Sequence, residues 1–69
     1  MKAQIIINWV DINLPPLTWR IIVMKQMKLL LKHKIFPAQI DENTEFNQEI
    51  IDALRQHIKE HYDKELPKF

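Results

Sequence analysis

The segment Thr18–Lys34 constrains the fold most strongly, because its apolar and basic residues repeat with the period of an α-helix. Along one side the apolar positions recur at helical spacing: Trp19, Ile22, Val23, Met27, Leu30 and Leu31. Lys25, Lys28 and Lys32 recur at helical spacing on the opposite side. The pattern predicts one amphipathic helix over the whole segment, with the Thr18 hydroxyl as its N-cap.

The positive charge of the chain is concentrated in this helix. Residues 18–36 hold five basic and no acidic side chains, whereas residues 37–69 hold four basic and eight acidic ones, and the net charge is only +1. Local charge steers an anionic partner toward one face of a protein more than net charge does. Ile21, Met24 and Leu29 add apolar surface beyond the main stripe. They indicate contacts on more than one side of the helix.

The segments on either side of this helix predict different structures. The run Ala3–Val10 is rich in Ile, Val and Trp, which favour β-structure, so a short N-terminal strand is predicted. Pro15 and Pro16 then interrupt regular backbone pairing. A second helix is predicted over residues 47–64, because apolar residues recur at every fourth position: Phe46, Ile50, Leu54, Ile58 and Tyr62.

Residues 38–46 connect the two predicted helices. Phe36-Pro37 ends the first helix, because proline pushes the preceding residue out of the helical region. Asp41-Glu42-Asn43-Thr44 is a turn signal, and Asn43 is the residue best able to adopt a left-handed conformation in a chain without glycine. The tip of the connector is either a tight hairpin or an open loop. The fold class predicted from these elements is helix-dominated α+β.

Length and composition limit how such a chain is stabilised. A 69-residue chain forms one domain, which we place over residues 1–69, and it buries only about 60% of the surface that its unfolded form exposes. Without cysteine, stability must come from apolar packing, self-association or a ligand. No secretory pattern follows Lys2, and four polar residues interrupt the apolar stretch Trp19–Leu31. We therefore expect a cytoplasmic protein with no membrane partner.

The residue types that carry most enzyme chemistry are missing. Glycine, serine and cysteine are absent, which excludes glycine-rich phosphate loops and the usual nucleophiles. His57-Ile58-Lys59-Glu60-His61 has the H-x-x-E-H form of one class of zinc peptidases. Two histidines need a third ligand and a substrate cleft, however, so we interpret His57 and His61 as half-exposed residues of the second helix. The sequence predicts a protein that is not an enzyme, with no metal and no cofactor.

Three short motifs connect the chain to a known family. Asn8-Trp9-Val10 precedes the proline break, Ile35-Phe36-Pro37 follows the basic helix, and Phe46-Asn47 opens the last helix. In this order the chain resembles, over about residues 5–58, the small phage and prophage excisionases, which have a winged, MerR-like DNA-binding fold. The resemblance implies that residues 18–34 enter the major groove and that residues 39–44 form a wing. Such proteins bend DNA at an attachment site and bias a recombinase toward excision, and some regulate transcription.

Double-stranded DNA is therefore the predicted partner, with a recombinase or other protein and further copies of the chain as additional partners. Cations at helical spacing can follow phosphates along the duplex. The residues expected to contact DNA are Thr18, Arg20, Lys25, Lys28, Lys32, Lys34, Gln39 and Asn43.

Other interpretations of the same residues remain open. The cations of the basic helix are also typical of a solvated helix face, or of a surface that binds a membrane or an acidic protein. A strand followed by two helices is also the order of the dimeric ribbon-helix-helix regulators. A third alternative is a phage-type adaptor or inhibitor that docks on a protein through the apolar surface of the basic helix.

Overall fold

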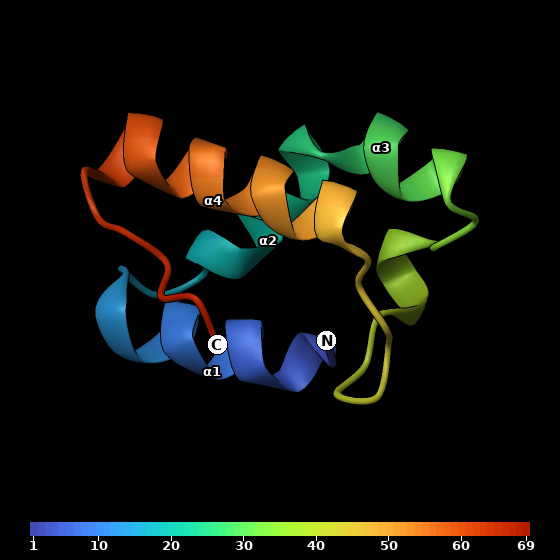
Figure 1. Ribbon diagram of the computed structural model, residues 1–69, viewed down its shortest axis with the longest axis horizontal. Helices are drawn as coiled ribbons and strands as arrows, with labels where there is room; N and C mark the ends of the chain where they lie inside the picture. Colours follow the sequence, from blue (N-terminus) through green and yellow to red (C-terminus); the bar gives the residue numbers. More distant parts are fainter.

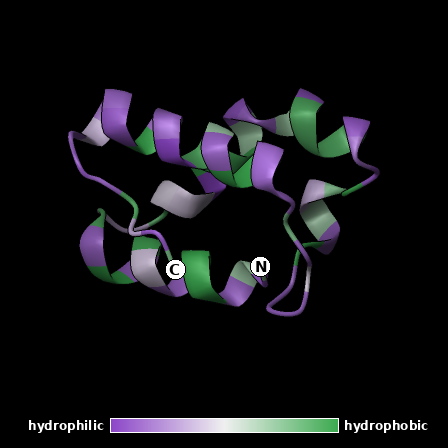
Figure 2. Ribbon diagram, in the orientation of Figure 1, coloured by the Kyte–Doolittle hydropathy of each residue, from purple (hydrophilic) through white to green (hydrophobic).

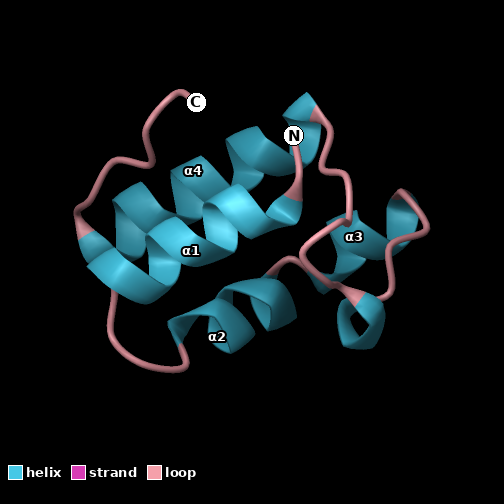
Figure 3. Cartoon of the chain, turned by 90° about the horizontal axis from the view of Figure 1, so that it is seen from below, coloured by secondary structure: helices cyan, strands magenta, loops and turns pink.

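The computed structural model describes all 69 residues and is built almost entirely from helices (Figure 1). In chain order the elements are α1 (Ala3–Asn13), α2 (Thr18–Lys25), α3 (Met27–Lys32), the 3₁₀ turn η1 (Pro37–Gln39) and α4 (Gln48–Tyr62). Helices α1 and α4 run in the same direction on opposite sides of the molecule, and α2 contacts α1, α3 and α4. Seen from below, α1 lies in front of α4, α2 runs along one edge of this pair, and the C-terminal tail runs along the opposite edge (Figure 3).

The predicted N-terminal strand is wrong, because Ala3–Asn13 forms helix α1. Ala3, Ile6 and Val10 are almost completely buried, and Leu14 continues the same stripe. This spacing is helical, and the burial of one continuous apolar stripe outweighs the weak preference of branched residues for strands. A helix also satisfies its own backbone hydrogen bonds, whereas a lone strand needs a partner strand.

The absence of a sheet corrects the predicted fold class. One isolated bridge between Lys2 and Glu45 is the only β-type pairing, and no strand forms anywhere in the 69 residues. The α+β class and the winged-helix architecture are therefore wrong. The alternative strand-helix-helix dimer is wrong for the same reason, because its defining strand is helix α1.

The predicted basic helix is present but divided at Gln26. The backbone of Gln26 departs from helical geometry (φ −101°, ψ 17°), and its N–H is shared between the carbonyls of Ile22 and Val23 at 3.1 and 3.2 Å. A single non-helical residue hardly disturbs the apolar period, so the sequence pattern is the same for one helix or two. Leu17, not Thr18, is the N-cap of α2, and no side chain caps that end. Thr18 is buried instead.

The second predicted helix is confirmed as α4, within two residues at each end. Asn47 is its N-cap, and the Asn47 Oδ1 accepts a hydrogen bond of 3.0 Å from the Ile50 N–H. Asp63 ends the helix in a left-handed conformation. The outer side of α4 is mostly hydrophilic, as Figure 2 shows, and its inner side supplies much of the core. The buried apolar residues of the whole chain are Ala3, Ile6, Val10, Leu14, Ile22, Val23, Leu30, Phe46, Ile50, Ile51, Leu54, Ile58 and Leu66.

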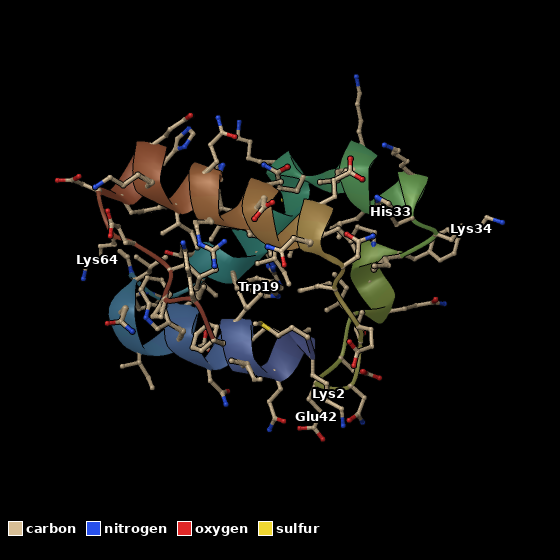
Figure 4. All side chains as sticks on the ribbon, viewed as in Figure 1. Lys2, Trp19, His33, Lys34, Glu42 and Lys64 are labelled. Atoms are coloured by element: carbon tan, nitrogen blue, oxygen red, sulfur yellow. The ribbon has the colours of Figure 1, made fainter.

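The connector between α3 and α4 caps helix α1 and does not form a wing. The carbonyl of Thr44 accepts a hydrogen bond of 2.7 Å from the Ala3 N–H, and the carbonyl of Glu42 accepts one of 3.2 Å from the Gln4 N–H. Lys2 and Glu42 consequently lie together at the start of α1 (Figure 4). Asn43 does not adopt a left-handed conformation, contrary to the prediction; Leu17, Lys34 and Asp63 do. The connector carbonyls thus satisfy N–H groups that every helix start leaves unpaired.

Candidate interaction surface

The predicted DNA-binding residues do not form one surface. Arg20, Lys25, Lys28 and Lys34 are exposed along α2, α3 and the following turn, and none of them has a carboxylate within ion-pair distance. Figure 4 shows Lys34 pointing away from the molecule. The other four predicted residues are placed differently: Thr18 is buried, Lys32 is paired, Gln39 lies in η1, and Asn43 lies in the turn beside α1.

Lys32 belongs to a polar network that joins the end of α3 to the start of α4. Its Nζ lies 3.1 Å from Oε2 of Glu49, and Nε2 of His33 lies 2.8 Å from Oε1 of the same carboxylate. The Asn47 amide nitrogen lies 3.1 Å from the His33 Nδ1, which fits a proton on Nε2 that is donated to Glu49. The hydrogen bond from Lys32, and then that from His33, lowers the pKa of Glu49. Lys32 is therefore mainly a link between helices.

The exposed side of α2 is apolar at its centre and basic at both edges. A helix turns by about 100° per residue, which places Ile21 and Met24 between Arg20 and Lys25. Ile21 is 48% exposed and Met24 is 62% exposed. Exposed apolar and basic residues also occur on α3, which follows directly after Gln26. We call the exposed residues of the two helices together the basic–apolar face: Arg20, Ile21, Met24, Lys25, Met27, Lys28 and Leu31. Leu29, which the sequence suggested for this apolar surface, packs against the core instead.

An open hollow of about 580 Å³ adjoins this face, between α2 and the η1 segment. We call it the α2–η1 hollow, and its lining residues are Trp19, Arg20, Val23, Met24, Pro37, Ala38 and Ile40. Trp19 also packs inward, with its ring centroid 6.2 Å from that of Phe46, and Figure 4 shows it on the inner side of α2. Arg20 is the only charged residue of the lining. The hollow can therefore take an apolar group that carries, or lies beside, a negative charge.

The η1 wall of the hollow was not predicted from the sequence. Pro37 was interpreted only as the end of a helix, but it also begins the short turn that faces α2. The signal was the apolar sequence Ile35-Phe36-Pro37-Ala38, in which Phe36 remains 55% exposed. A segment that is apolar, irregular and incompletely buried often marks a binding surface.

The H-x-x-E-H string does not assemble a metal site. The rings of His57 and His61 stack with their centroids 4.1 Å apart, and no group of three or more potential metal-ligating side chains occurs in the structure. His57 is buried, contrary to its predicted half-exposure, and its Nε2 has no hydrogen-bond partner. Desolvation, followed by the charges of His61 and Lys25, lowers the pKa of His57. Its role is in the core of the protein.

No family model, curated protein or solved structure matches the chain. None of its helices combines the length and the apolar character needed to cross a bilayer. The functional assignment consequently depends on the basic–apolar face and the α2–η1 hollow.

Proposed function

We propose that this chain is a non-enzymatic, cytoplasmic protein-interaction domain that binds a partner protein through the basic–apolar face and the α2–η1 hollow. The observation that carries the proposal is the exposure of Ile21 and Met24 in the middle of α2, directly beside an apolar hollow. The cores of protein interfaces are enriched in methionine, aromatic residues and arginine. Met24, Trp19 and Arg20 provide this combination at one site.

Burial of these side chains supplies the driving force for association. Complete burial of a side chain such as Met or Ile contributes about 1.5–3 kcal/mol. Ile21, Met24, Met27 and Leu31 are each between 41% and 62% exposed, so part of this contribution remains for a partner. Methionine adapts to differently shaped surfaces because its side chain is unbranched and polarizable. The basic–apolar face is therefore suited to bind the apolar side chains of a peptide segment of the partner.

Selection from a random peptide library displayed on phage tests the proposal. Peptides enriched on the immobilised wild-type chain are expected to lose binding to the Met24→Gln variant, which removes an apolar contact without adding charge. They should still bind the matched Ile12→Gln variant, because Ile12 is 82% exposed on α1 and lies outside the face. Enrichment of the same peptides on both variants, or no enrichment at all, would exclude the face as a docking site.

Binding of double-stranded DNA is the second candidate, and one group of observations favours it. Arg20, Lys25, Lys28 and Lys34 have no acidic partner within the chain, and only the residues Leu14–Leu17 separate α1 from α2. Two helices joined by such a short turn are common in DNA-binding proteins. In this case the chain would act as an architectural or regulatory factor beside a recombinase. It ranks second because apolar side chains, which lack groups to pair with phosphates, hold the centre of the exposed side of α2.

A further inference from the structure

We infer that the partner segment is an acidic amphipathic helix of another protein, which inserts a bulky apolar side chain into the α2–η1 hollow and aligns carboxylates with Arg20, Lys25 and Lys28. This inference depends on the proposed protein-binding function and specifies the partner. It combines the shape of the hollow with the charges along its edge.

Charge complementarity requires an acidic partner. The three cations of the face have no carboxylate within 4.0 Å. The carboxylate that reaches α3 from within the chain is that of Glu49, and it is occupied by Lys32 and His33. Carboxylates on the partner would therefore meet free cations. Complementary charges at the edge of an interface increase the association rate and exclude partners of the wrong sign.

The apolar lining of the hollow and the apolar residues of α3 determine which positions of the partner helix must be apolar. The hollow is about 580 Å³ in volume, which lies within the range of about 300–1,000 Å³ that is typical of ligand pockets. One large side chain can enter between Trp19 and Pro37. A second anchor, one or two turns further along the partner helix, can lie on Met27 and Leu31 of α3. A helix that binds in a groove presents anchors at positions i, i+3 or i+4, and i+7.

A second copy of this chain is a poor occupant. A symmetric dimer through the basic–apolar face would bring the cations of one copy against those of the other, and such like-charge contacts are unfavourable. The exposed Asp52 and Glu60 of α4 are accompanied on their side of the helix by Gln48 and Gln56, which offer no apolar anchor. The most exposed apolar residue of α1, Ile12, shares its helix with a single acidic residue, Asp11. Neither of these helices supplies several carboxylates together with an apolar anchor, so a segment of another protein is the favoured occupant.

Three fluorescein-labelled helical peptides test this inference by fluorescence anisotropy on the full chain. The first carries Phe and Leu anchors at i, i+4 and i+7 with Glu at the remaining positions. The second has the same anchors with Lys in place of Glu, and the third keeps Glu but has Ala anchors. The acidic anchored peptide is expected to bind at least about tenfold more tightly than either control. The Lys peptide loses several edge ion pairs of about two- to fivefold each, and the Ala peptide loses the burial of its large apolar anchors.

Charge-swap variants locate the contact. The Arg20→Glu/Lys25→Glu double variant should invert the preference, so that the Lys peptide binds more tightly than the Glu peptide. The Lys68→Glu variant, altered in an exposed residue of the C-terminal tail, should keep the wild-type preference. Both changes are at exposed positions, and circular dichroism would confirm that the variants are folded.

The outcomes separate the two proposals. Equal binding of the Glu and Lys peptides, or an unchanged preference in the double variant, would overturn the acidic partner. If library peptides that depend on Met24 lacked acidic residues, the protein-binding function would stand and this inference would fall. If no peptide depended on Met24 in either experiment, both would fall.

Discussion

His57 is the only buried ionisable residue of the chain, and it lies on the inner side of α4 with an unpaired Nε2. Desolvation makes its protonated form unfavourable in the folded protein. The neighbouring charges of His61 and Lys25 act in the same direction, and Glu60 opposes them. The folded-state pKa is therefore below the ordinary value of 6.5. The unfolded chain binds this proton at a higher pH than the folded chain does.

Stability should consequently fall as the pH falls below about 6.5. Above this pH His57 is neutral in both states and contributes no pH dependence, whereas below it the unfolded state gains a proton that the folded state resists. Urea unfolding at pH 7.5, 6.5 and 5.5 measures the change. The His57→Leu variant should show a weaker dependence, and the His61→Gln variant should retain most of it because His61 is exposed. A wild-type stability that stays constant or rises toward pH 5.5 would contradict the assignment. Glu49, whose pKa is lowered from 4.5, contributes only at lower pH.

Lys34 occupies a position where glycine would cause less backbone strain, but the chain contains no glycine. It has a left-handed conformation (φ 61°) directly after α3. The N–H groups of Ile35 and Lys34 donate to the carbonyls of Leu30 and Leu31, each at 2.9 Å. This pair of bonds is the Schellman motif, in which glycine is the usual left-handed residue because it has no Cβ.

The Lys34→Gly variant should therefore raise the free energy of unfolding by about 0.5–1 kcal/mol, the relief of left-handed strain less the greater freedom of glycine in the unfolded chain. Lys34→Ala removes the charge but keeps the Cβ, so it should change stability by less than about 0.5 kcal/mol. Thermal and urea denaturation of both variants give the comparison. A destabilised glycine variant would show that the lysine side chain contributes more than its backbone conformation costs.

At the scale of the elements, α4 depends on its N-cap. The Asn47 side chain accepts from the Ile50 N–H and also reaches His33, so one residue caps α4 and connects it to the end of α3. The Asn47→Ala variant should lose about 1 kcal/mol of stability. The matched Asn43→Ala variant should be nearly neutral, because no hydrogen bond involves the Asn43 side chain. Equal losses in the two variants, measured by urea unfolding, would refute the capping role.

The two long helices show why one element was predictable and another was not. The residues of α4 alternate cleanly between apolar and polar sides, and the cap residue Asn47 precedes them. In α1 the helical stripe of Ala3, Ile6 and Val10 was present in the sequence but obscured by additional Ile and Trp residues, which favour strands. Helical spacing was the better guide, since burial contributes more than intrinsic preference. The break between α2 and α3 at Gln26 could not be predicted, because one non-helical residue hardly changes the spacing of the apolar residues.

The candidate surface was predictable in its charges but not in their partners. The concentration of cations in residues 18–34 could be read from the sequence, and Arg20, Lys25 and Lys28 are exposed in the structure. The burial of Thr18 and the pairing of Lys32 with Glu49, 17 residues away, depend on how α3 meets α4. The α2–η1 hollow depends on where the chain turns after Phe36. Contacts between segments distant in sequence do not follow from the periodicity of either segment.

At the scale of the whole molecule, the distribution of charge separates the two candidate functions. A chain of net charge +1 attracts nucleic acid only through its local cations, and along α2, α3 and the turn that follows four cations are free of acidic partners: Arg20, Lys25, Lys28 and Lys34. Each phosphate that a cation neutralises contributes about −0.9 to the slope of log K against log salt concentration. Binding of duplex DNA by these residues should therefore have a slope no steeper than about −4.

Two parallel salt titrations, one of binding to mixed-sequence duplex DNA and one of binding to the acidic anchored peptide, distinguish the two candidate functions. We expect weak, sequence-independent duplex binding, whose slope becomes shallower by about 1 in the Lys28→Gln variant and is unchanged in Met24→Gln, because only the lysine contacts a phosphate. Peptide binding should show a large loss in Met24→Gln and a small one in Lys28→Gln. Its salt dependence should be shallower than that of duplex binding, because apolar burial is little affected by screening and only the edge ion pairs are weakened. Tight, sequence-specific duplex binding that survives Met24→Gln would reverse the ranking, because the exposed apolar centre of α2 would then have no part in recognition.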